Sequence, residues 1–243
     1  MADWLSRTEL CIGTEGLKRL QASNVLVVGL GGVGAYAAEM ICRAGVGKMT
    51  IVDGDTIHPS NRNRQLPALV STEGRSKAEV MAARLIDINP DIILTVIAEY
   101  IKDDRMIEIL DAGFDYVVDA IDTLSPKVFL IYHSMKKNFP VVSSMGAGGK
   151  FDPTSIGICD ISETTNCTLA RILRKRLHRL GIHNGFMAVY SPEVVDKDRV
   201  VETEGEQNKK SIVGTISYMP AAFGIACASV VIRRLSGHFS DLL

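Results

Sequence analysis

The sequence predicts an α/β protein built on a doubly wound, mostly parallel, Rossmann-like sheet. Short apolar runs alternate with helical segments over the first 150 residues, and this alternation is typical of parallel strands joined by crossover helices. A glycine-rich turn stands directly after the first of these runs. Hydrophobic residues make up 47% of the chain and charged residues 23%, which is ordinary for a globular protein with a sizeable core.

The predicted strands are short aliphatic runs, as expected where a strand is buried on both faces. They are Val25–Val28, Met49–Val52, Ile92–Ile97, Tyr116–Asp122 and Pro140–Met145. Helices are predicted between them, and glycine or an Asn-Pro pair ends the first two. These helices are Ala35–Ala44, Lys77–Ile88, Met106–Leu110 and Ser125–Asn138.

Beyond Gly149 the regular alternation ends. We expect a basic helix at Thr168–Leu180, a strand at Met187–Tyr190 and a charged loop at Val195–Lys210. We therefore divide the chain into a first domain, residues 1–149, and an extension, residues 150–243, that adds to the same sheet rather than folding independently.

The uncharged stretch Ser211–Ile232 is long enough to span a membrane. Its proline, glycines and serines instead favour a helix buried in the core or at a subunit interface, so we expect membrane contact to be at most peripheral. The polar segment Met1–Glu9 does not resemble a signal peptide. These features predict a cytoplasmic protein.

The chain has five cysteines and no C-x-x-C pair, which argues against a disulfide framework and against a four-thiolate zinc site. We expect Cys227 to be packed in the apolar C-terminal stretch, and nothing around Cys167 requires a reactive thiol. The formal net charge of −1 neither favours nor excludes a polyanionic partner.

The glycine turn carries the first functional signal. Gly29, Gly31, Gly32 and Gly34 fit G-x-G-x-x-G after a strand and before a helix. Glycines there let the backbone approach a phosphate, and the helix N-terminus supplies amide hydrogens and partial positive charge. Asp53, after the second strand, suits the hydroxyls of a ribose. On these two features alone, a nicotinamide dehydrogenase is the leading interpretation.

The loop "DGDTIHPSNRNRQLP" (Asp53–Pro67) changes that interpretation. Arg64 and Lys77 place two cations near the glycine turn, where arginine can fork onto phosphate oxygens and lysine acts as a point charge. Such charge suits a triphosphate better than a pyrophosphate diester. Asp122, in "DAIDT", is expected at the carboxyl ends of the strands, where it can hold Mg²⁺ bridging the phosphates. Taken singly, each of these residues is more often an ordinary surface charge.

The motifs "GLGGVG", "DGD", "NRNRQ" and "DAIDT", together with Lys77, resemble the adenylating enzymes that activate ubiquitin-like proteins, the ThiF/MoeB-like superfamily. The resemblance covers about Arg7 to Gly149. It implies that ATP is bound by the following residues besides the four glycines: Asp53 on the ribose, Asp55, Arg64, Gln65 and Lys77 around the phosphates, and Asn61 and Asn63 along the α-phosphate.

By the same resemblance, Arg64, Lys77, Asp122 and Asn61 are the catalytic residues, and Asp122 attends the metal. Arg7 corresponds to an N-terminal arginine that reaches the phosphates of the partner subunit, which implies a homodimer. The resemblance leaves open a monovalent cation (Na⁺ or K⁺) held by backbone carbonyls and docking of a sulfur-relay protein.

A narrower resemblance covers nearly the whole chain. "GAGGKFDPT" (Gly146–Thr154) and "GTISYMPAAFG" (Gly214–Gly224) look like segments of the tRNA threonylcarbamoyladenosine dehydratases. This group implies ATP-dependent closure of a side-chain carboxylate onto its own carbamoyl group, in the modified nucleoside beside the anticodon, through an acyl adenylate. Intramolecular attack needs no enzyme nucleophile, because proximity replaces a second reactant.

The basic helix supports a polyanionic substrate. Between Thr164 and His183 the chain has five Arg or Lys residues and no acid. We expect four of them to contact the tRNA backbone, and three recur at helical spacing on one face. The four are Arg171, Arg174, Lys175 and Arg179. A solvated helical face is the alternative.

Three other functions remain open at the level of sequence. An activator of a small ubiquitin-like sulfur-carrier protein would adenylate a C-terminal glycine. A nicotinamide dehydrogenase would bind NAD more tightly than ATP and would tolerate loss of Arg64. A catalytically silent binding module is disfavoured because the cation and acid positions are all intact.

Overall fold

The computed structural model describes residues 3–101, 104–202 and 211–238. Seven strands form one sheet in the order β3-β2-β1-β4-β5-β7-β6. All neighbours in it are parallel except β6 and β7. The strands are β1 (Asn24–Val28), β2 (Lys48–Val52), β3 (Ile93–Ile97), β4 (Tyr116–Asp119), β5 (Val141–Ser144), β6 (Gly157–Asp160) and β7 (Met187–Tyr190). This architecture confirms the predicted fold class.

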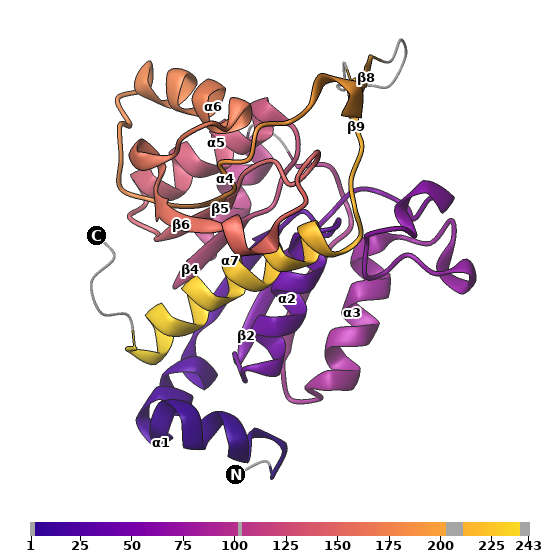
Figure 1. The fold of residues 1–243 in the computed structure, drawn as a ribbon. Helices are drawn as coiled ribbons and strands as arrows, with labels where there is room; N and C mark the ends of the chain where they lie inside the picture. The colour runs from indigo at the N-terminus through magenta and orange to yellow at the C-terminus, as the bar shows by residue number, and fades with distance from the viewer. Residues whose placement is uncertain (1–2, 102–103, 203–210, 239–243) are drawn as a thin grey trace.

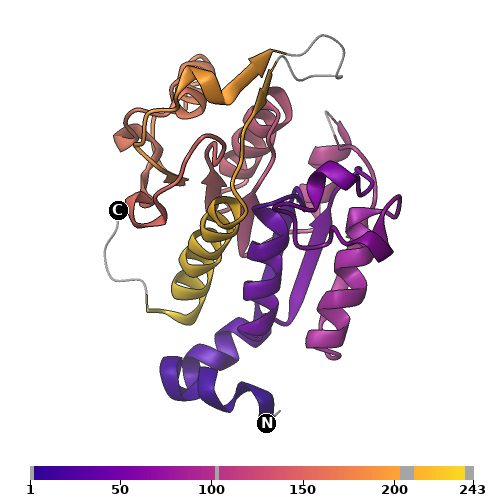
Figure 2. The same ribbon diagram turned by 45° about the vertical axis from the view of Figure 1, so that its right-hand side comes forward.

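Helices cover both faces of this sheet, as Figures 1 and 2 show. They are α1 (Ser6–Ala22), α2 (Gly34–Arg43), α3 (Lys77–Ile88), α4 (Asp104–Asp111), α5 (Leu124–Lys136), α6 (Thr168–His178) and α7 (Tyr218–Ser236). Short 3₁₀ turns lie at Asp3–Leu5, Pro59–Asn61, Val70–Thr72, Pro153–Ser155, Ile161–Glu163 and Lys197–Arg199.

Strand alternation divides the core into two apolar clusters. In β1, Val25 and Val27 pack with residues of α2, α3 and α7, whereas Leu26 and Val28 pack with residues of α4, α5 and α6. Successive strand side chains point to opposite faces, so one strand contributes to both clusters. The chain changes faces between β1 and β4, and this switch point is where open α/β sheets bind ligands.

The C-terminal part differs from its predicted organisation. The predicted charged loop instead contains β8 (Val200–Glu202), which pairs with β9 (Ser211–Val213); residues 203–210 of that loop lie outside the described part. The uncharged stretch is not one helix, since β9 and a connecting segment precede α7. A glycine and a β-branched residue, Gly214 and Thr215, follow β9 and disfavour an earlier helix start. The division at residue 149 stays a prediction.

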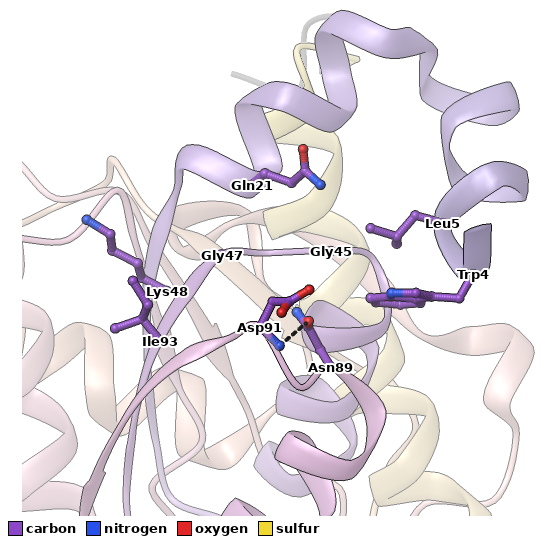
Figure 3. Close-up of a pocket in the computed structure, with 9 residues that line it drawn as sticks. All are labelled: Trp4, Leu5, Gln21, Gly45, Gly47, Lys48, Asn89, Asp91 and Ile93. Carbon is purple, nitrogen blue, oxygen red and sulfur yellow. Dashed lines mark hydrogen bonds between the residues drawn. The ribbon is translucent and has the colours of Figure 1, made fainter. Parts of the chain in front are cut away.

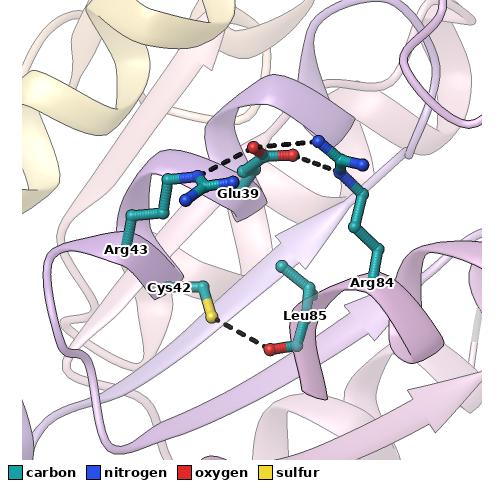
Figure 4. Close-up of polar contacts among 5 residues, drawn as sticks. All are labelled: Glu39, Cys42, Arg43, Arg84 and Leu85. Atoms are coloured by element: carbon teal, nitrogen blue, oxygen red, sulfur yellow. Dashed lines mark hydrogen bonds and ion pairs between the residues drawn. The ribbon is translucent and has the colours of Figure 1, made fainter. Parts of the chain in front are cut away.

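A buried carboxylate ties α2 to α3. Glu39 accepts hydrogen bonds from Arg43 at 2.8 Å and from Arg84 at 2.5 and 3.2 Å, and Cys42 Sγ donates to the carbonyl of Leu85 at 3.4 Å (Figure 4). The N-termini of these two helices carry the glycine turn and Lys77. The contacts hold the two helices together well away from those N-termini.

Candidate nucleotide-binding site

Steric crowding restricts three of the four glycines of the turn, Gly29, Gly32 and Gly34. Gly29 has φ of +90°, and an added Cβ would lie 2.7 Å from the carbonyl oxygen of Ala120. A Cβ on Gly34 would lie 1.7 Å from the carbonyl oxygen of Gly29. At Gly31, by contrast, the nearest atom would be 3.6 Å away, in the amide of Gln65. The first and last glycines therefore serve packing, and Gly31 leaves the backbone open to a close ligand.

The start of α7 packs on the same turn. A Cβ on Gly32 would lie 2.8 Å from Cβ of Pro220, which is buried at the beginning of α7. This contact places the end of the β9–α7 connection beside the glycine turn. The same connection supplies the carbonyl of Thr215, which accepts a 3.0 Å hydrogen bond from Nδ2 of Asn63.

Asp53 follows β2 and turns its carboxylate into the glycine turn. Its oxygens accept hydrogen bonds from the backbone N–H of Leu30 at 2.6 Å and of Asp55 at 2.8 Å. Burial raises the pKa of Asp53, while Lys77 and the two backbone donors oppose that shift. The carboxylate is thus fixed where a ribose hydroxyl can donate to it.

Lys77 is the first residue of α3, and Ser76 caps that helix by accepting a hydrogen bond from a backbone N–H. The lysine side chain is 5% exposed, and Nζ lies 2.7 Å from Oδ2 of Asp55. The other oxygen of Asp55 accepts a hydrogen bond from the hydroxyl of Tyr100, which raises the tyrosine pKa to about 12. Sequence reasoning missed Tyr100, because its loop after β3 meets the "DGD" turn only in the folded sheet.

Arg64 lies half-buried in the loop before α3. One guanidinium nitrogen donates to the carbonyl of Ser60 at 2.9 Å and to Oδ1 of Asn63 at 2.8 Å. Burial lowers the pKa of Arg64, and the charge of Asp122 opposes that effect. Arg64 and Asp122 are therefore within electrostatic reach, although they come from loops after different strands. The strand before Asp122 is shorter than predicted and ends at Asp119.

The remaining loop residues have distinct positions. Asn61 is buried, and its Oδ1 accepts a 3.0 Å hydrogen bond from the backbone N–H of His58, so it caps the 3₁₀ turn. Oε1 of Gln65 is buried and has no hydrogen-bond partner among the described residues. A buried acceptor of this kind is costly unless a ligand or water satisfies it. Gln65, next to Gly31, thus has unused bonding capacity inside the site.

An ion pair that is buried on both sides lies beneath the loop after β4. Lys127 in α5 and Asp119 at the end of β4 are each 0% exposed, and Nζ lies 2.7 Å from Oδ2. Only the second acid of "DAIDT", Asp122, was expected to matter from sequence. The apolar run around Lys127 gave no signal that this lysine turns into the core.

The basic helix α6, with Arg179 at its C-cap, presents three of the four predicted contact residues to solvent. Arg171, Lys175 and Arg179 are exposed. Arg174 is half-buried, and its guanidinium donates to the carbonyl of Thr164 at 2.9 Å, so this side chain braces the preceding turn. Arg176 donates to Oγ of Ser125 at 3.0 Å at the start of α5, which joins the basic helix to the loop that carries Asp122.

Arg7 does not approach the glycine turn of its own chain. It lies exposed in α1, which extends from the end of the molecule opposite the β8–β9 hairpin (Figures 1 and 2). The preceding residues line a cavity of about 250 Å³ at the amino ends of β2 and β3, with Trp4, Lys48 and Asp91 among its walls (Figure 3). Because nucleotides bind at the carboxyl ends of such strands, this cavity is not the nucleotide site.

Helix α7 is long and apolar enough to cross a membrane by length and composition, and half of its most apolar window is buried. Its buried residues belong to the core cluster around α2 and β1, among them Met219, Phe223, Cys227 and Val231. Packing of this kind is the behaviour of a core helix, as predicted. Burial also raises the pKa of Cys227 to about 12.

The ThiF family model matches residues 5–242. The tRNA threonylcarbamoyladenosine dehydratase of Bacillus subtilis is 38% identical over 242 residues, covering 97% of this chain and 95% of that protein. The Escherichia coli enzyme of the same name is 41% identical over 165 residues, covering 68% of this chain and 62% of that protein.

A solved structure of the Escherichia coli dehydratase in complex with ATP superposes with a TM-score of 0.88 at 32% identity. It covers 96% of this chain and 94% of the solved one. The Escherichia coli sulfur carrier protein ThiS adenylyltransferase is more distant, at 33% identity over 141 residues, 57% of this chain and 56% of that protein. These matches confirm the resemblance found in the sequence, and the chain belongs to the ThiF family.

Proposed function

We propose that this protein is an ATP-dependent tRNA threonylcarbamoyladenosine dehydratase. Similarity along nearly the whole chain to enzymes of that name carries the proposal. The site supports it independently, because a ribose-binding acid, a buried lysine and a half-buried arginine gather around an open glycine turn. A nicotinamide cofactor would not need the two cations.

The reaction removes water from the modified nucleoside at the expense of ATP. A carboxylate oxygen attacks the α-phosphorus, pyrophosphate leaves, and an acyl adenylate forms. The carbamoyl nitrogen or oxygen of the same side chain then attacks the acyl carbon, and AMP leaves with the carboxylate oxygen. Both reacting groups belong to one substrate, so the chain needs no transfer cysteine.

The side chains divide this work by position. Asp53 accepts hydrogen bonds from the ribose, and the Nε2 group of Gln65 and the glycine-turn amides donate to phosphate oxygens. Arg64 and Lys77 stabilise charge that develops during attack and departure. Lys77 is paired with Asp55 in this structure. When phosphate binds, the ammonium either exchanges the Asp55 carboxylate for a phosphate oxygen or contacts both.

Asn61 and Asn63 stay in the proposal with different roles. Asn63 is exposed at the crevice and already orients the guanidinium of Arg64. Asn61 is buried as a turn cap, which assigns it to shaping the loop that carries Arg64.

Magnesium would be held through Asp122. Among the described residues, no group of three or more His, Cys, Asp or Glu side chains is arranged to hold a metal. Mg²⁺ bound to nucleotides commonly takes one or two carboxylates and fills its other positions with phosphate oxygens and water. One acid beside Arg64 fits this coordination, and bound magnesium would neutralise phosphate charge.

A monovalent cation does not fit the carbonyls that converge most clearly in the extension. The carbonyls of Ser191 and Glu193 both accept hydrogen bonds from the buried ammonium of Lys150, the first at 3.0 Å. A lysine already supplies the positive charge there, so Na⁺ or K⁺ would need other carbonyls.

The tRNA would lie along α6, with Arg171, Lys175 and Arg179 on its phosphates. Arg176 connects that helix to the loop of Asp122, so the anticodon region can reach the crevice from it. Arg7 would complete the site of a partner subunit in a homodimer, consistent with its distance from the glycine turn in its own chain. We place the enzyme in the cytoplasm.

Nucleoside mass spectrometry tests the function directly. Incubation with Mg-ATP and tRNA bearing the linear nucleoside should yield a product lighter by one water. Arg64→Ala should abolish the product, whereas Arg62→Ala, in the same loop but exposed, should not. Pyrophosphate exchange that is stimulated only by a carrier protein, and never by this tRNA, would favour the sulfur-carrier activator instead.

Binding of tRNA is tested separately. Replacing Arg171, Lys175 and Arg179 together by Glu should remove tRNA binding and leave ATP affinity unchanged. Unchanged tRNA affinity would exclude α6 from the tRNA surface.

A further inference from the structure

The buried lysine of α5 has no role in the function proposed above. Lys127 is 0% exposed, and its ammonium contacts Oδ2 of Asp119 at 2.7 Å and the carbonyl of Ile121 at 3.0 Å. Lysine is almost never fully buried unless it is paired. A buried ion pair costs about as much in desolvation as it gains in attraction, and well-packed apolar residues often replace one without loss. Stability alone therefore does not account for this pair.

Asp119 gathers further hydrogen bonds at the same point. Its Oδ2 accepts from the hydroxyl of Ser143 in β5 at 2.6 Å, and its Oδ1 accepts from the backbone N–H of Ile121 at 3.2 Å. Lys127 bonds to the carbonyl of that same Ile121. The backbone of Ile121 is thus held on both sides, through its N–H and through its carbonyl, by one buried network.

The segment fixed in this way forms a wall of the nucleotide crevice. Ala120 donates its N–H to the carbonyl of Val28 at 2.9 Å, and its own carbonyl lies so close to Gly29 that a Cβ there would be 2.7 Å away. The next residue after Ile121 is Asp122, whose charge acts on Arg64. Displacement of Ile121 would therefore move Asp122 relative to the glycine turn.

We propose that Lys127 is a positioning residue for adenylation: with Asp119 it locks Ala120–Asp122 so that the Asp122 carboxylate stays aligned with Arg64 across the crevice. Lys127 does not touch the nucleotide. No apolar side chain can donate to a carboxylate and a carbonyl at once, whereas the Lys127 ammonium contacts both. The role in adenylation rests on the proposed function, whereas the fixing of Ala120–Asp122 by Lys127 can be tested without it.

The experiment separates positioning from stability by comparing two variants. Lys127→Met leaves Asp119 as an unpaired buried charge, and we expect it to lower stability and activity together. The double variant Lys127→Met with Asp119→Asn removes both charges; the amide oxygen can still accept from the N–H of Ile121, and the amide nitrogen can donate to the hydroxyl of Ser143. We expect its Tm to return close to that of the wild type.

Adenylation in the double variant should remain impaired despite this recovery. We expect kcat of tRNA-stimulated pyrophosphate exchange to be about tenfold to a hundredfold below wild type, with KM for ATP nearly unchanged, because sub-ångström misplacement affects the reacting geometry more than binding. Glu39→Gln is the matched control, since it disturbs another buried carboxylate, between α2 and α3. It should lower Tm while kcat stays near wild type.

Amide hydrogen exchange gives a second readout that does not depend on catalysis. In the double variant the amides of Ala120–Thr123 should exchange faster, and those of β1 and β2 should not. Wild-type kcat in the double variant, or unchanged protection of Ala120–Thr123, would overturn the proposal. If the wild type shows no exchange activity with tRNA, the proposed function fails, and hydrogen exchange still decides the role of Lys127.

Discussion

Replacing Glu39 by Gln should destabilise the fold without touching the nucleotide crevice. The carboxylate is 6% exposed and accepts three hydrogen bonds, at 2.5, 2.8 and 3.2 Å, from two arginines (Figure 4). The side chains of Arg43 and Arg84 are 50% and 44% exposed. Hydrogen bonds to charged groups contribute about 1.5–3 kcal/mol each, but the arginines can return to water when their partner is lost.

The exposure of the two arginines determines how much unfolding free energy the Glu39→Gln substitution removes. Glutamine retains one amide oxygen that can accept from Arg84, and both arginines can be resolvated, so most of the gross energy is recovered. We expect a net loss of about 2 kcal/mol in the free energy of unfolding. For a domain of this size, Tm changes by roughly 2–4 °C per kcal/mol, so we expect Tm to fall by several degrees.

Acid should reduce the difference in unfolding free energy between the wild type and the Glu39→Gln variant. Burial raises the pKa of Glu39, but the hydrogen bonds and charges of Arg84 and Arg43 outweigh it, so the pKa lies below its ordinary value of 4.5. A lowered folded pKa gives stability that is full above the ordinary value and is lost as pH falls through the folded value. The Glu39→Gln penalty should therefore be constant near neutral pH and should shrink as the pH falls below the ordinary value of 4.5 and through the lowered pKa.

Chemical denaturation at several pH values measures this penalty. Glu15→Gln is the control, because Glu15 lies 3.6 Å from Arg19 in an exposed i,i+4 pair, with side chains 70% and 54% exposed. Such pairs contribute about 0.5 kcal/mol or less. Equal penalties for the two substitutions, or a Glu39→Gln penalty that grows in acid, would refute the reasoning.

Three further predictions follow from the site and the core. Burial raises the pKa of Asp53 above its ordinary value of 3.8, so ATP affinity measured by calorimetry should weaken as the pH falls through the raised pKa. Asp53→Asn should remove this dependence. The same pH profile in the variant and the wild type would contradict the prediction. Gly34→Ala should prevent stable folding, because its Cβ would lie 1.7 Å from a carbonyl oxygen. Gly74→Ala has open space at φ of +79° and should lower the free energy of unfolding by only about 1 kcal/mol. A thermal melt of each variant checks both expectations. Cys11 is exposed and Cys227 is buried, so a thiol reagent should modify the first in the native protein and the second only after unfolding; early labelling of the buried thiol would refute its packing.

The elements that the sequence predicted well are those with local signals. The helix Lys77–Ile88 and the strand Met187–Tyr190 have the predicted limits at both ends. A serine cap and a following Asn-Pro pair mark the first, and a short apolar run marks the second. Such signals reside in neighbouring residues, so no tertiary information is needed.

The missed elements lack those signals. Helix α1 buries only Gly16, Leu17 and Leu20 among its members and contains Gly13 at φ of +75°, so its apolar periodicity is weak and interrupted. Strand β6 is an antiparallel edge strand, half-buried, with glycine, cysteine and aspartate among four residues. It pairs with β7, which follows only after the intervening helix α6, so neighbouring residues do not indicate the pairing.

The same distinction separates predicted from unpredicted site residues. The glycine turn, Asp53 and Lys77 follow from spacing along a βαβ unit, since the sheet order brings consecutive strand ends together. Lys127 and Tyr100 could not be found in this way. Lys127 is paired with Asp119, and Tyr100 with Asp55, and each partner lies in another segment of the chain. Without knowledge of these partners, a lysine or tyrosine in a sequence is interpreted as an ordinary surface residue.

The charges of the crevice indicate which group must move when a nucleotide binds. Lys77 is 5% exposed and is anchored at the first turn of α3, whereas the carboxylate of Asp55 beside it is 45% exposed. A buried ammonium that loses its partner is left as an uncompensated charge, which is strongly destabilising, whereas an exposed carboxylate can rotate toward water or toward a bound cation at little cost. In the proposed site, phosphate would reach Lys77 by displacing Asp55 or sharing it, and Tyr100, which bonds to the other oxygen of Asp55, would follow that displacement.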